Sequence, residues 1–147
     1  MSESDLSIEL FQKTPFKFAL QKNGELTQIS LSVLENATNL NLKERIDSVG
    51  RRLFFTIQNE IGIALARNKA ISQLVASGSV DAGIVGLDQV YESGLKDQLL
   101  ILREFKEVGE WDIVLATPED RNFASISEIL VVATQYPVIA QAFFCFN

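Results

Sequence analysis

Short apolar runs of strand type alternate along this chain with short segments of helical periodicity. A strand buried in a parallel sheet reads as a continuous run of Val, Ile and Leu, and crossover helices join parallel neighbours. The alternation therefore predicts an α/β fold with a mainly parallel sheet and helices on both faces. The expected strands cover residues 16–20, 51–57, 61–66, 80–86, 99–105, 111–118 and 129–134, and the expected helices cover residues 26–37, 71–76, 87–93, 125–129 and 137–146.

The chain of 147 residues has the size of one domain or of two small lobes. Residues 1–15 are polar and acidic, unlike a secretory signal, and are expected to form a leader. Residues 16–98 are expected to form a first α/β lobe and residues 99–147 part of a second one. The division is placed at GLKDQL (94–99), where the chain can cross between lobes.

Charge and composition narrow the class of protein. The chain has 13 basic and 19 acidic residues, a formal net charge of −6, which disfavours a nucleic-acid or anionic-membrane surface. It has no histidine and one cysteine, so the sequence offers no disulfide, zinc site or Ser–His nucleophile pair. No apolar run reaches the roughly 18–20 residues of a membrane span. We expect a cytoplasmic protein with no metal site of its own.

In open α/β sheets, ligands bind beyond the carboxyl ends of the strands, and three strand-to-helix turns have suitable chemistry. The first is FALQKNGELT (18–27). Here Gly24 allows the backbone to approach a ligand, Lys22 supplies a cation, and a helix N-terminus follows. Together these features can hold an anion, although most turns of this kind are ordinary loops.

The second turn is VDAGIVGLD (80–88). Gly83 and Gly86 allow a flat ligand to lie against the strand exit. Asp81 or Asp88 can accept hydrogen bonds from ribose hydroxyls or amino groups. The alternative is structural, with Asp88 as a helix N-cap and Asp81 as a partner of nearby backbone amides.

The third turn is VVATQYPVIAQAFF (131–144). The hydroxyl of Thr134 lies where a strand is expected to stop and a helix to start. The alternative is a simple connection, with Tyr136 packed on the surface. Arg67 is a further contributor if it faces the same cleft, although a lone arginine is usually solvated.

These segments, in this order, resemble the ATP phosphoribosyltransferases, the enzymes that open histidine biosynthesis. The similarity runs from about residue 16 to about residue 144. The glycine-aspartate block and the Thr-Tyr-Pro segment carry its most specific part. The matching segments are FALQKNGEL, RRLFF, ARNKAISQLVASGSVDAGIVGLDQVYE, GEWDIVLATPED and VVATQYPVIAQAFF.

The resemblance implies transfer of a phosphoribosyl group from phosphoribosyl pyrophosphate to N1 of the adenine ring of ATP, with Mg²⁺ present. It also implies a two-lobe fold of the type II periplasmic-binding-protein kind, with substrates in the cleft between lobes. A homo-oligomer or a regulatory subunit is expected as partner. The residues that would face the nucleotide are Lys22, Gly24, Arg67, Asp81, Gly83, Gly86, Asp88, Thr134 and Tyr136.

The sequence also departs from the family pattern, at Glu25, Ala70, Ser72 and Asp112. It stops at Asn147, before the family's glycine- and threonine-rich loop for the ribose-phosphate. We therefore expect a fragment, a truncated gene product or a degenerate paralogue that is inactive alone. The alternatives are a non-catalytic nucleotide-binding paralogue or regulatory module of the same fold, and a solute-binding or regulator effector domain.

Overall fold

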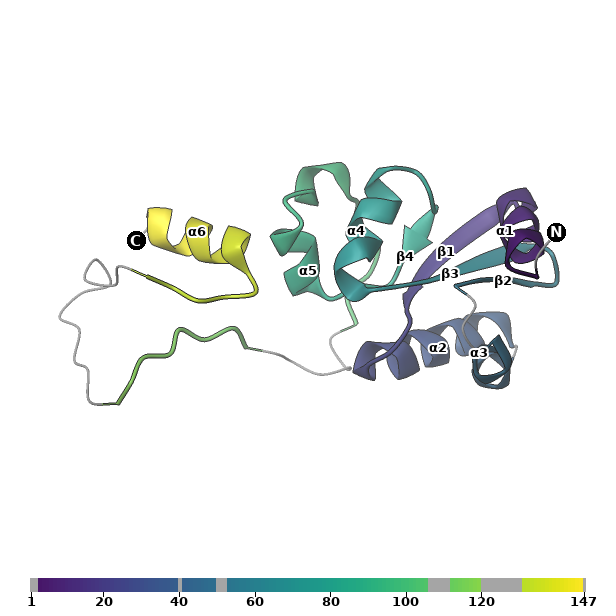
Figure 1. Cartoon of the computed structure of the whole chain (residues 1–147), viewed down its shortest axis with the longest axis horizontal. Coiled ribbons are helices and arrows are strands. Elements are labelled where there is room, and N and C mark those ends of the chain that lie inside the picture. Colours follow the sequence, from purple (N-terminus) through teal and green to yellow (C-terminus); the bar gives the residue numbers. More distant parts are fainter. Residues whose placement is uncertain (1–2, 40, 50–52, 106–111, 120–130, 147) are drawn as a thin grey trace. The chain divides into compact units, whose positions relative to one another are not determined.

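The computed structural model of the chain describes residues 3–39, 41–49, 53–105, 112–119 and 131–146. The chain divides into two compact units, residues 1–100 and 101–147. The first unit is a mixed α/β structure whose mostly parallel sheet is flanked by helices (Figure 1), as the alternating pattern predicts.

The sheet of the first unit has four strands in the order β2-β3-β1-β4. β1 (Phe16–Gln21) is parallel to β3 (Ile61–Ala66) on one side and to β4 (Ala82–Gly83) on the other. β2 (Phe54–Ile57) is antiparallel to β3 and lies at the edge. Because β1 is central, the exits of the two parallel strands β1 and β3 lie next to each other.

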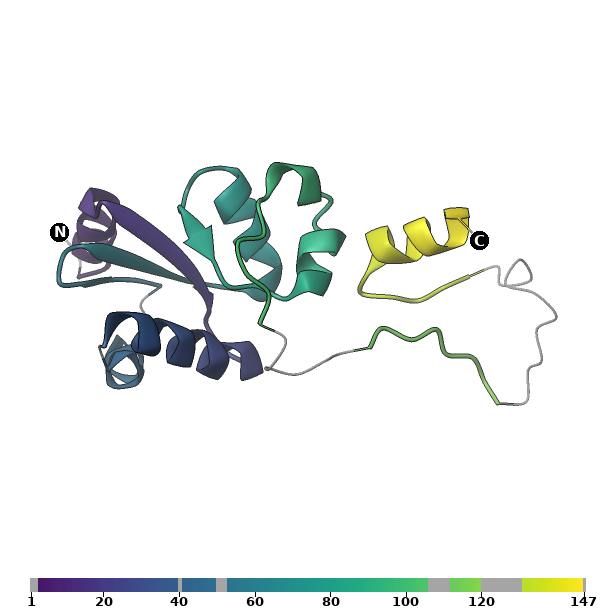
Figure 2. The same cartoon turned by 180° about the vertical axis from the view of Figure 1, so that it is seen from behind.

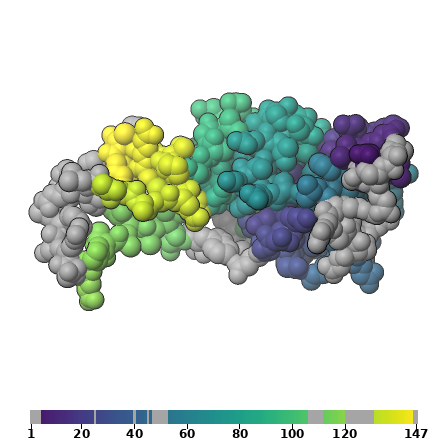
Figure 3. Space-filling model, in the orientation of Figure 1, coloured from purple at the N-terminus to yellow at the C-terminus, as the bar shows by residue number. Residues whose placement is uncertain are grey.

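Helices cover both faces of this sheet, as two opposite views show (Figures 1 and 2). In the space-filling view, teal atoms of the α4 region and blue-violet atoms of the α2 region lie on the visible surface of the first unit (Figure 3). α5 packs on α4 and is followed by the short 3-10 helix η1. The helices of this unit are α1 (Glu3–Lys13), α2 (Glu25–Thr38), α3 (Leu42–Val49), α4 (Asn68–Ala76), α5 (Leu87–Glu92) and η1 (Lys96–Gln98).

The core has two parts because successive side chains of a strand point to opposite faces. Leu20 and Ile63 are fully buried on the face covered by α2 and α3, while Ala19 and Ala64 are buried on the face covered by α1 and α4. Ile71 of α4 lies in the second cluster. The apolar runs of β1 and β3 therefore serve both faces, which explains why they are continuous rather than alternating.

Two helices of the first unit have no counterpart among the predicted elements. α1 forms within residues 1–15, the expected leader, and its buried Phe11 packs against Phe54 with ring centroids 5.0 Å apart. α3 packs against α2 and buries Leu42. Both helices carry many charged residues, so the few apolar positions that anchor them do not form a clear helical pattern in the sequence.

The prediction of three strands after residue 98 is wrong for the residues that the structure describes. Residues 99–105, 112–118 and 131–134 form no strand there. Strand formation requires a hydrogen-bonded neighbour, and an apolar run alone does not supply one. Their side chains stay open to solvent, with Leu100, Leu102 and Val131 82%, 79% and 88% exposed. The expected helix 125–129 lies outside the described residues.

The helix predicted at the end of the chain is confirmed. α6 (Pro137–Phe146) begins at the proline, where a missing N–H leaves no hydrogen bond unmade. In the first unit, the predicted strand 80–86 shortens to the two residues of β4, and the predicted strand 61–66 matches β3 at both ends.

A side chain of α2 caps α3 and suggests a test of the fold. Glu35 Oε1 accepts the backbone N–H groups of Leu42 at 2.7 Å and Lys43 at 2.9 Å. These are two of the N-terminal donors that a helix cannot satisfy itself. Glu35→Ala is expected to lower the free energy of unfolding by about 1–2 kcal/mol, measured by urea denaturation. The control is Gln28→Ala, an exposed side chain of nearly the same shape on the same helix, and equal midpoints for both variants would contradict the capping role.

Candidate functional site

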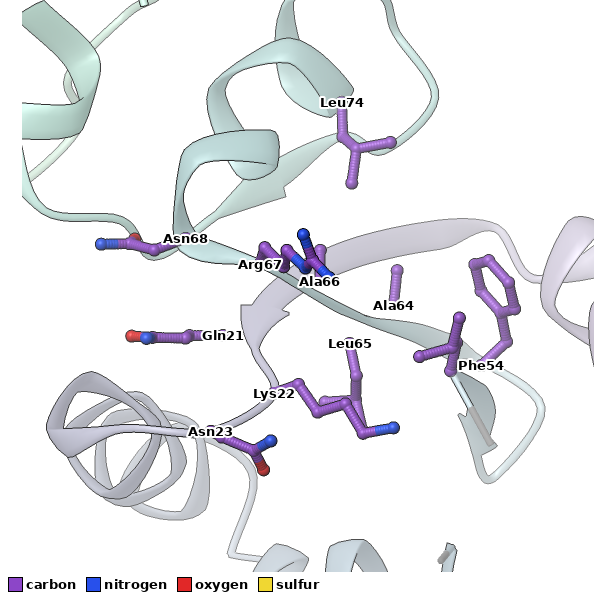
Figure 4. Close-up of a pocket in the computed structure, with 11 residues that line it drawn as sticks. Gln21, Lys22, Asn23, Phe54, Ala64, Leu65, Ala66, Arg67, Asn68 and Leu74 are labelled. Carbon is purple, nitrogen blue, oxygen red and sulfur yellow. The ribbon is translucent and has the colours of Figure 1, made fainter. Parts of the chain in front are cut away.

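A pocket of about 620 Å³ lies at the carboxyl ends of β1 and β3 and beside the start of β2 (Figure 4). This is the edge at which ligands bind in open α/β sheets. Much of its wall is apolar, and polar side chains come from the two strand exits. The lining residues are Gln21, Lys22, Asn23, Leu53, Phe54, Ala64, Leu65, Ala66, Arg67, Asn68 and Leu74.

Two of the predicted site residues, Lys22 and Arg67, line this pocket. The Lys22 backbone N–H donates to the Ala66 carbonyl at 2.9 Å, which extends the β1–β3 ladder by one residue. Arg67 is the extended, exposed N-cap residue of α4. Because the ladder holds both residues at the same edge, the pocket offers two cations next to an apolar wall. Such a combination suits a ligand that has an anionic part and an apolar part.

Gly24 shapes the first turn without lining the pocket. Its φ of 124° is a conformation that residues with a side chain rarely adopt, and an added Cβ would lie 2.7 Å from Gln21 Nε2. Thr27 closes the turn, because its N–H donates to the Gly24 carbonyl and its hydroxyl donates to the Gln21 carbonyl, each at 3.1 Å. The side chain of Glu25 lies outside the described part of the structure.

Asp81 lies at the start of β1 rather than at its exit. Its Oδ2 accepts the Lys17 N–H at 2.7 Å, and its own N–H donates to the Lys17 carbonyl at 2.9 Å. The pocket begins at the other end of the strand, at Gln21. The contact is the one foreseen in the structural alternative for Asp81, a bond to a nearby backbone amide.

Neighbouring side chains occupy the space that a Cβ would need at the two glycines of the second turn. A Cβ at Gly83 would lie 2.6 Å from Ile71 Cγ2, so the missing side chain lets α4 pack closely on β1 and β4. A Cβ at Gly86 would collide with the Asp88 carboxylate. Gly86 is itself the N-cap of α5, so the alternative that made Asp88 the cap is wrong. Asp88 lies in the first turn, where Gln89 Nε2 donates to its Oδ2 at 2.8 Å.

Thr134 and Tyr136 belong to the second unit. Thr134 Oγ1 accepts the Tyr136 N–H at 2.9 Å, just before α6 begins at Pro137. Thr134 is exposed and Tyr136 is half-buried. The hydroxyl thus stabilises the turn that leads into the helix.

Several pocket residues were missed by the sequence reasoning. Gln21 and Asn68 each follow an apolar strand directly, or one residue later, and a polar residue at that position was the available signal. Asn23 lies within the turn that was singled out for Lys22 and Gly24. For Leu53 and Phe54 the sequence predicts a strand and gives no sign of a pocket. Their position in the pocket depends on the pairing of β2 with β3, which is a long-range contact.

The part of the chain that the structure describes holds no group of three or more His, Cys, Asp or Glu side chains that could bind a metal ion. None of its helices has the length and apolar character needed to cross a bilayer.

The sheet order defines an α/β protein with a pocket at its strand exits, the edge at which ligands bind in open α/β sheets. The sequence model of the ATP phosphoribosyltransferase family matches residues 67–146, more than half of the chain. The chain therefore belongs to the ATP phosphoribosyltransferase family.

Individual relatives carry the same name. The chain is 36% identical to the ATP phosphoribosyltransferase of Methanocaldococcus jannaschii over 131 residues, which are 86% of this chain and 43% of the relative. It is 33% identical to that of Methanothermobacter thermautotrophicus (85% of this chain, 42% of the relative) and 34% identical to that of Haloarcula marismortui (87% and 44%). The chain thus spans less than half the length of the curated relatives it matches.

The contact between Asp81 and Lys17 leads to a stability prediction. Asp81→Ala removes the acceptor of the Lys17 N–H, and because the carboxylate is exposed the expected loss is about 1 kcal/mol of unfolding free energy. Urea denaturation followed by circular dichroism measures it. Asp97→Ala, which removes an exposed carboxylate of η1, serves as the matched control. If Asp81→Ala were no less stable than the control, the structural role would fail and the ligand role would remain.

Proposed function

We propose that this chain supplies the ATP-binding part of an ATP phosphoribosyltransferase, the enzyme that transfers a phosphoribosyl group to ATP at the start of histidine biosynthesis. The observation that carries the proposal is the pocket at the exits of β1 and β3, which Lys22 and Arg67 line together with apolar side chains. Membership of the family supplies the reaction class.

ATP fits the chemistry of this pocket. The adenine ring is flat and largely apolar on its faces, and the apolar residues that line the pocket offer a matching surface. The triphosphate is anionic, and Lys22 and Arg67 offer the opposite charge. Cations fixed at one edge of the sheet need no rearrangement when the phosphates arrive, which favours binding in the reactive orientation.

The second substrate, phosphoribosyl pyrophosphate, would bind with the help of a second lobe, in a fold of the type II periplasmic-binding-protein kind. In this proposal residues 16–98 are the first lobe, and residues 99–147 are part of the second and contribute Thr134 and Tyr136. In this proposal Asp81 fixes the entry end of β1, Gly83 lets α4 pack on the sheet, and Gly86 and Asp88 form the start of α5. Mg²⁺ would be held mainly by pyrophosphate oxygens, because this ion commonly combines substrate phosphates with few protein ligands.

The exposed apolar segments favour a partner for this chain. Leu100, Leu102 and Val131 are almost fully exposed within runs whose composition is typical of buried strands. We propose that the rest of the family's chain, a second copy or a regulatory subunit covers them, in a protein that acts in the cytoplasm. Unpaired apolar runs of this kind promote association.

Charge removal in the pocket tests ATP binding. Lys22→Ala and Arg67→Ala are each expected to lower the affinity for ATP by about tenfold, because each removes a cation from the phosphate end of the pocket. Isothermal titration calorimetry with the 147-residue chain measures the affinity. Lys69→Ala is the matched control, an exposed lysine of α4 that does not line the pocket. Equal losses in all three variants would reduce the effect to net charge and contradict a specific site.

Catalysis is expected to need more of the family's chain than these residues. The chain alone should form no phosphoribosyl-ATP from both substrates and Mg²⁺, followed by absorbance against a blank without protein. Adding the part of the Methanocaldococcus jannaschii relative that lies beyond the aligned region should produce it, with that part alone as control. Product from this chain alone would contradict the expectation. Failure of the mixture, with ATP binding intact, would favour a non-catalytic nucleotide-binding module.

A further inference from the structure

In the part of the chain that the structure describes, three buried side-chain atoms have no hydrogen-bond partner. They are Gln21 Oε1, Asn68 Oδ1 and Ser72 Oγ. Native proteins leave few buried polar atoms unpaired, and each such atom calls for an explanation such as a bound water or ligand. Gln21 and Asn68 line the pocket, whereas Ser72 does not.

The ladder brings these groups to one corner of the first unit. Gln21 pairs with Ala66 across β1 and β3, and Ala66 packs into the cluster on the α4 face, so Gln21 also faces α4. Asn68 follows Ala66 by two residues through the extended Arg67, which returns it to the same face. In Figure 4 the side chains of Gln21 and Asn68 extend to the same side, away from Phe54. Ser72 lies one helical turn beyond Asn68 on α4.

Primary amides have a specific hydrogen-bonding capacity. Each presents one acceptor oxygen and a donor nitrogen side by side, and the two ends have nearly the same shape. Rotation about the last torsion exchanges them without moving the backbone, because that torsion is broad. The buried oxygen of each amide can therefore move to the position that the amide nitrogen now holds. Two such amides at one end of a pocket are complementary to a ligand edge that has an N–H donor beside an acceptor.

The amino edge of adenine has this arrangement, with an exocyclic amino group beside a ring nitrogen, and Asn and Gln are the side chains that pair with it. A 6-oxo purine has a carbonyl oxygen in place of the amino group. That oxygen would face the amide oxygens, and no hydrogen bond forms between two acceptors. Buried polar groups left unpaired in this way make a site reject the wrong ligand strongly.

We propose that Gln21 and Asn68 are specificity-determining residues that select a 6-amino purine over a 6-oxo purine. The inference rests on the proposed function, which places ATP in this pocket, and adds the residues that recognise its base. Lys22 and Arg67 attract any nucleoside triphosphate, so the selection among bases falls to the two amides.

The test compares ATP with inosine triphosphate, which has the same sugar and phosphates but an oxo group at position 6. Calorimetric titration of the 147-residue chain should show about tenfold tighter binding of ATP. Gln21→Met and Asn68→Leu should each reduce this ratio towards one while inosine triphosphate still binds. Asn68→Asp keeps acceptor oxygens at the position and should retain the preference for the amino purine.

Ser72→Ala is the matched control, because it removes a buried unpaired oxygen outside the pocket lining. It should raise the free energy of unfolding and leave the ratio unchanged. A ratio of one in the unmodified chain, or a ratio that survives both Gln21→Met and Asn68→Leu, would overturn the inference while leaving ATP binding intact. Binding of neither nucleotide would overturn the proposed function, and this inference with it.

Discussion

The rest of this structure depends on the central position of β1 in its ladder. β1 is hydrogen-bonded to β3 along its full length and to β4 at its middle. The contact of Asp81 with Lys17 sets the register at one end of the strand, and the bond from the Lys22 N–H to the Ala66 carbonyl continues the ladder at the other. Because the backbone is held at both ends, the side chains beyond the exit stand on a rigid edge. The pocket is a consequence of this pairing.

Much of the first unit could be predicted from local patterns. The boundaries of β3 and the position of α4 follow from apolar periodicity and from turn residues close in sequence, as does α6 in the second unit. The second unit could not be predicted in this way, because the runs 99–105 and 112–118 have the composition of strands but no partner among the described residues. Sheet pairing is a long-range property, whereas composition is local. α1 was missed for the opposite reason, since a single buried face, anchored by Phe11, stabilises an otherwise polar helix.

The candidate site shows the same division. Lys22 and Arg67 were found because a cation next to a strand-to-helix turn is visible in the sequence. Asp81 and Gly83 share the signature of ligand residues, yet one bonds to the Lys17 amide and the other makes room for Ile71. A carboxylate or a glycine near a strand is compatible with ligand binding and also with a purely structural contact. The contacts of Asp81 and Gly83 depend on the register of β4 against β1, which the local sequence does not reveal. For Gln21 and Asn68 the sequence offers only a polar residue after a strand, and the stronger signal, an oxygen that is buried and unpaired, exists only in three dimensions.

Unpaired buried oxygens have a physical cost that bears on why this corner exists. Each lowers stability by about 1–3 kcal/mol relative to a paired group, and an apolar side chain of similar shape would remove the loss. Local rules are broken in this way mainly where function requires it. Gln21 and Asn68 break the rule at the strand exits, beside two cations and an apolar wall, where a ligand would supply the missing donors. In the proposed complex, the stability that the free chain lacks at this corner would be recovered on binding, because a ligand that satisfies buried groups stabilises the folded state.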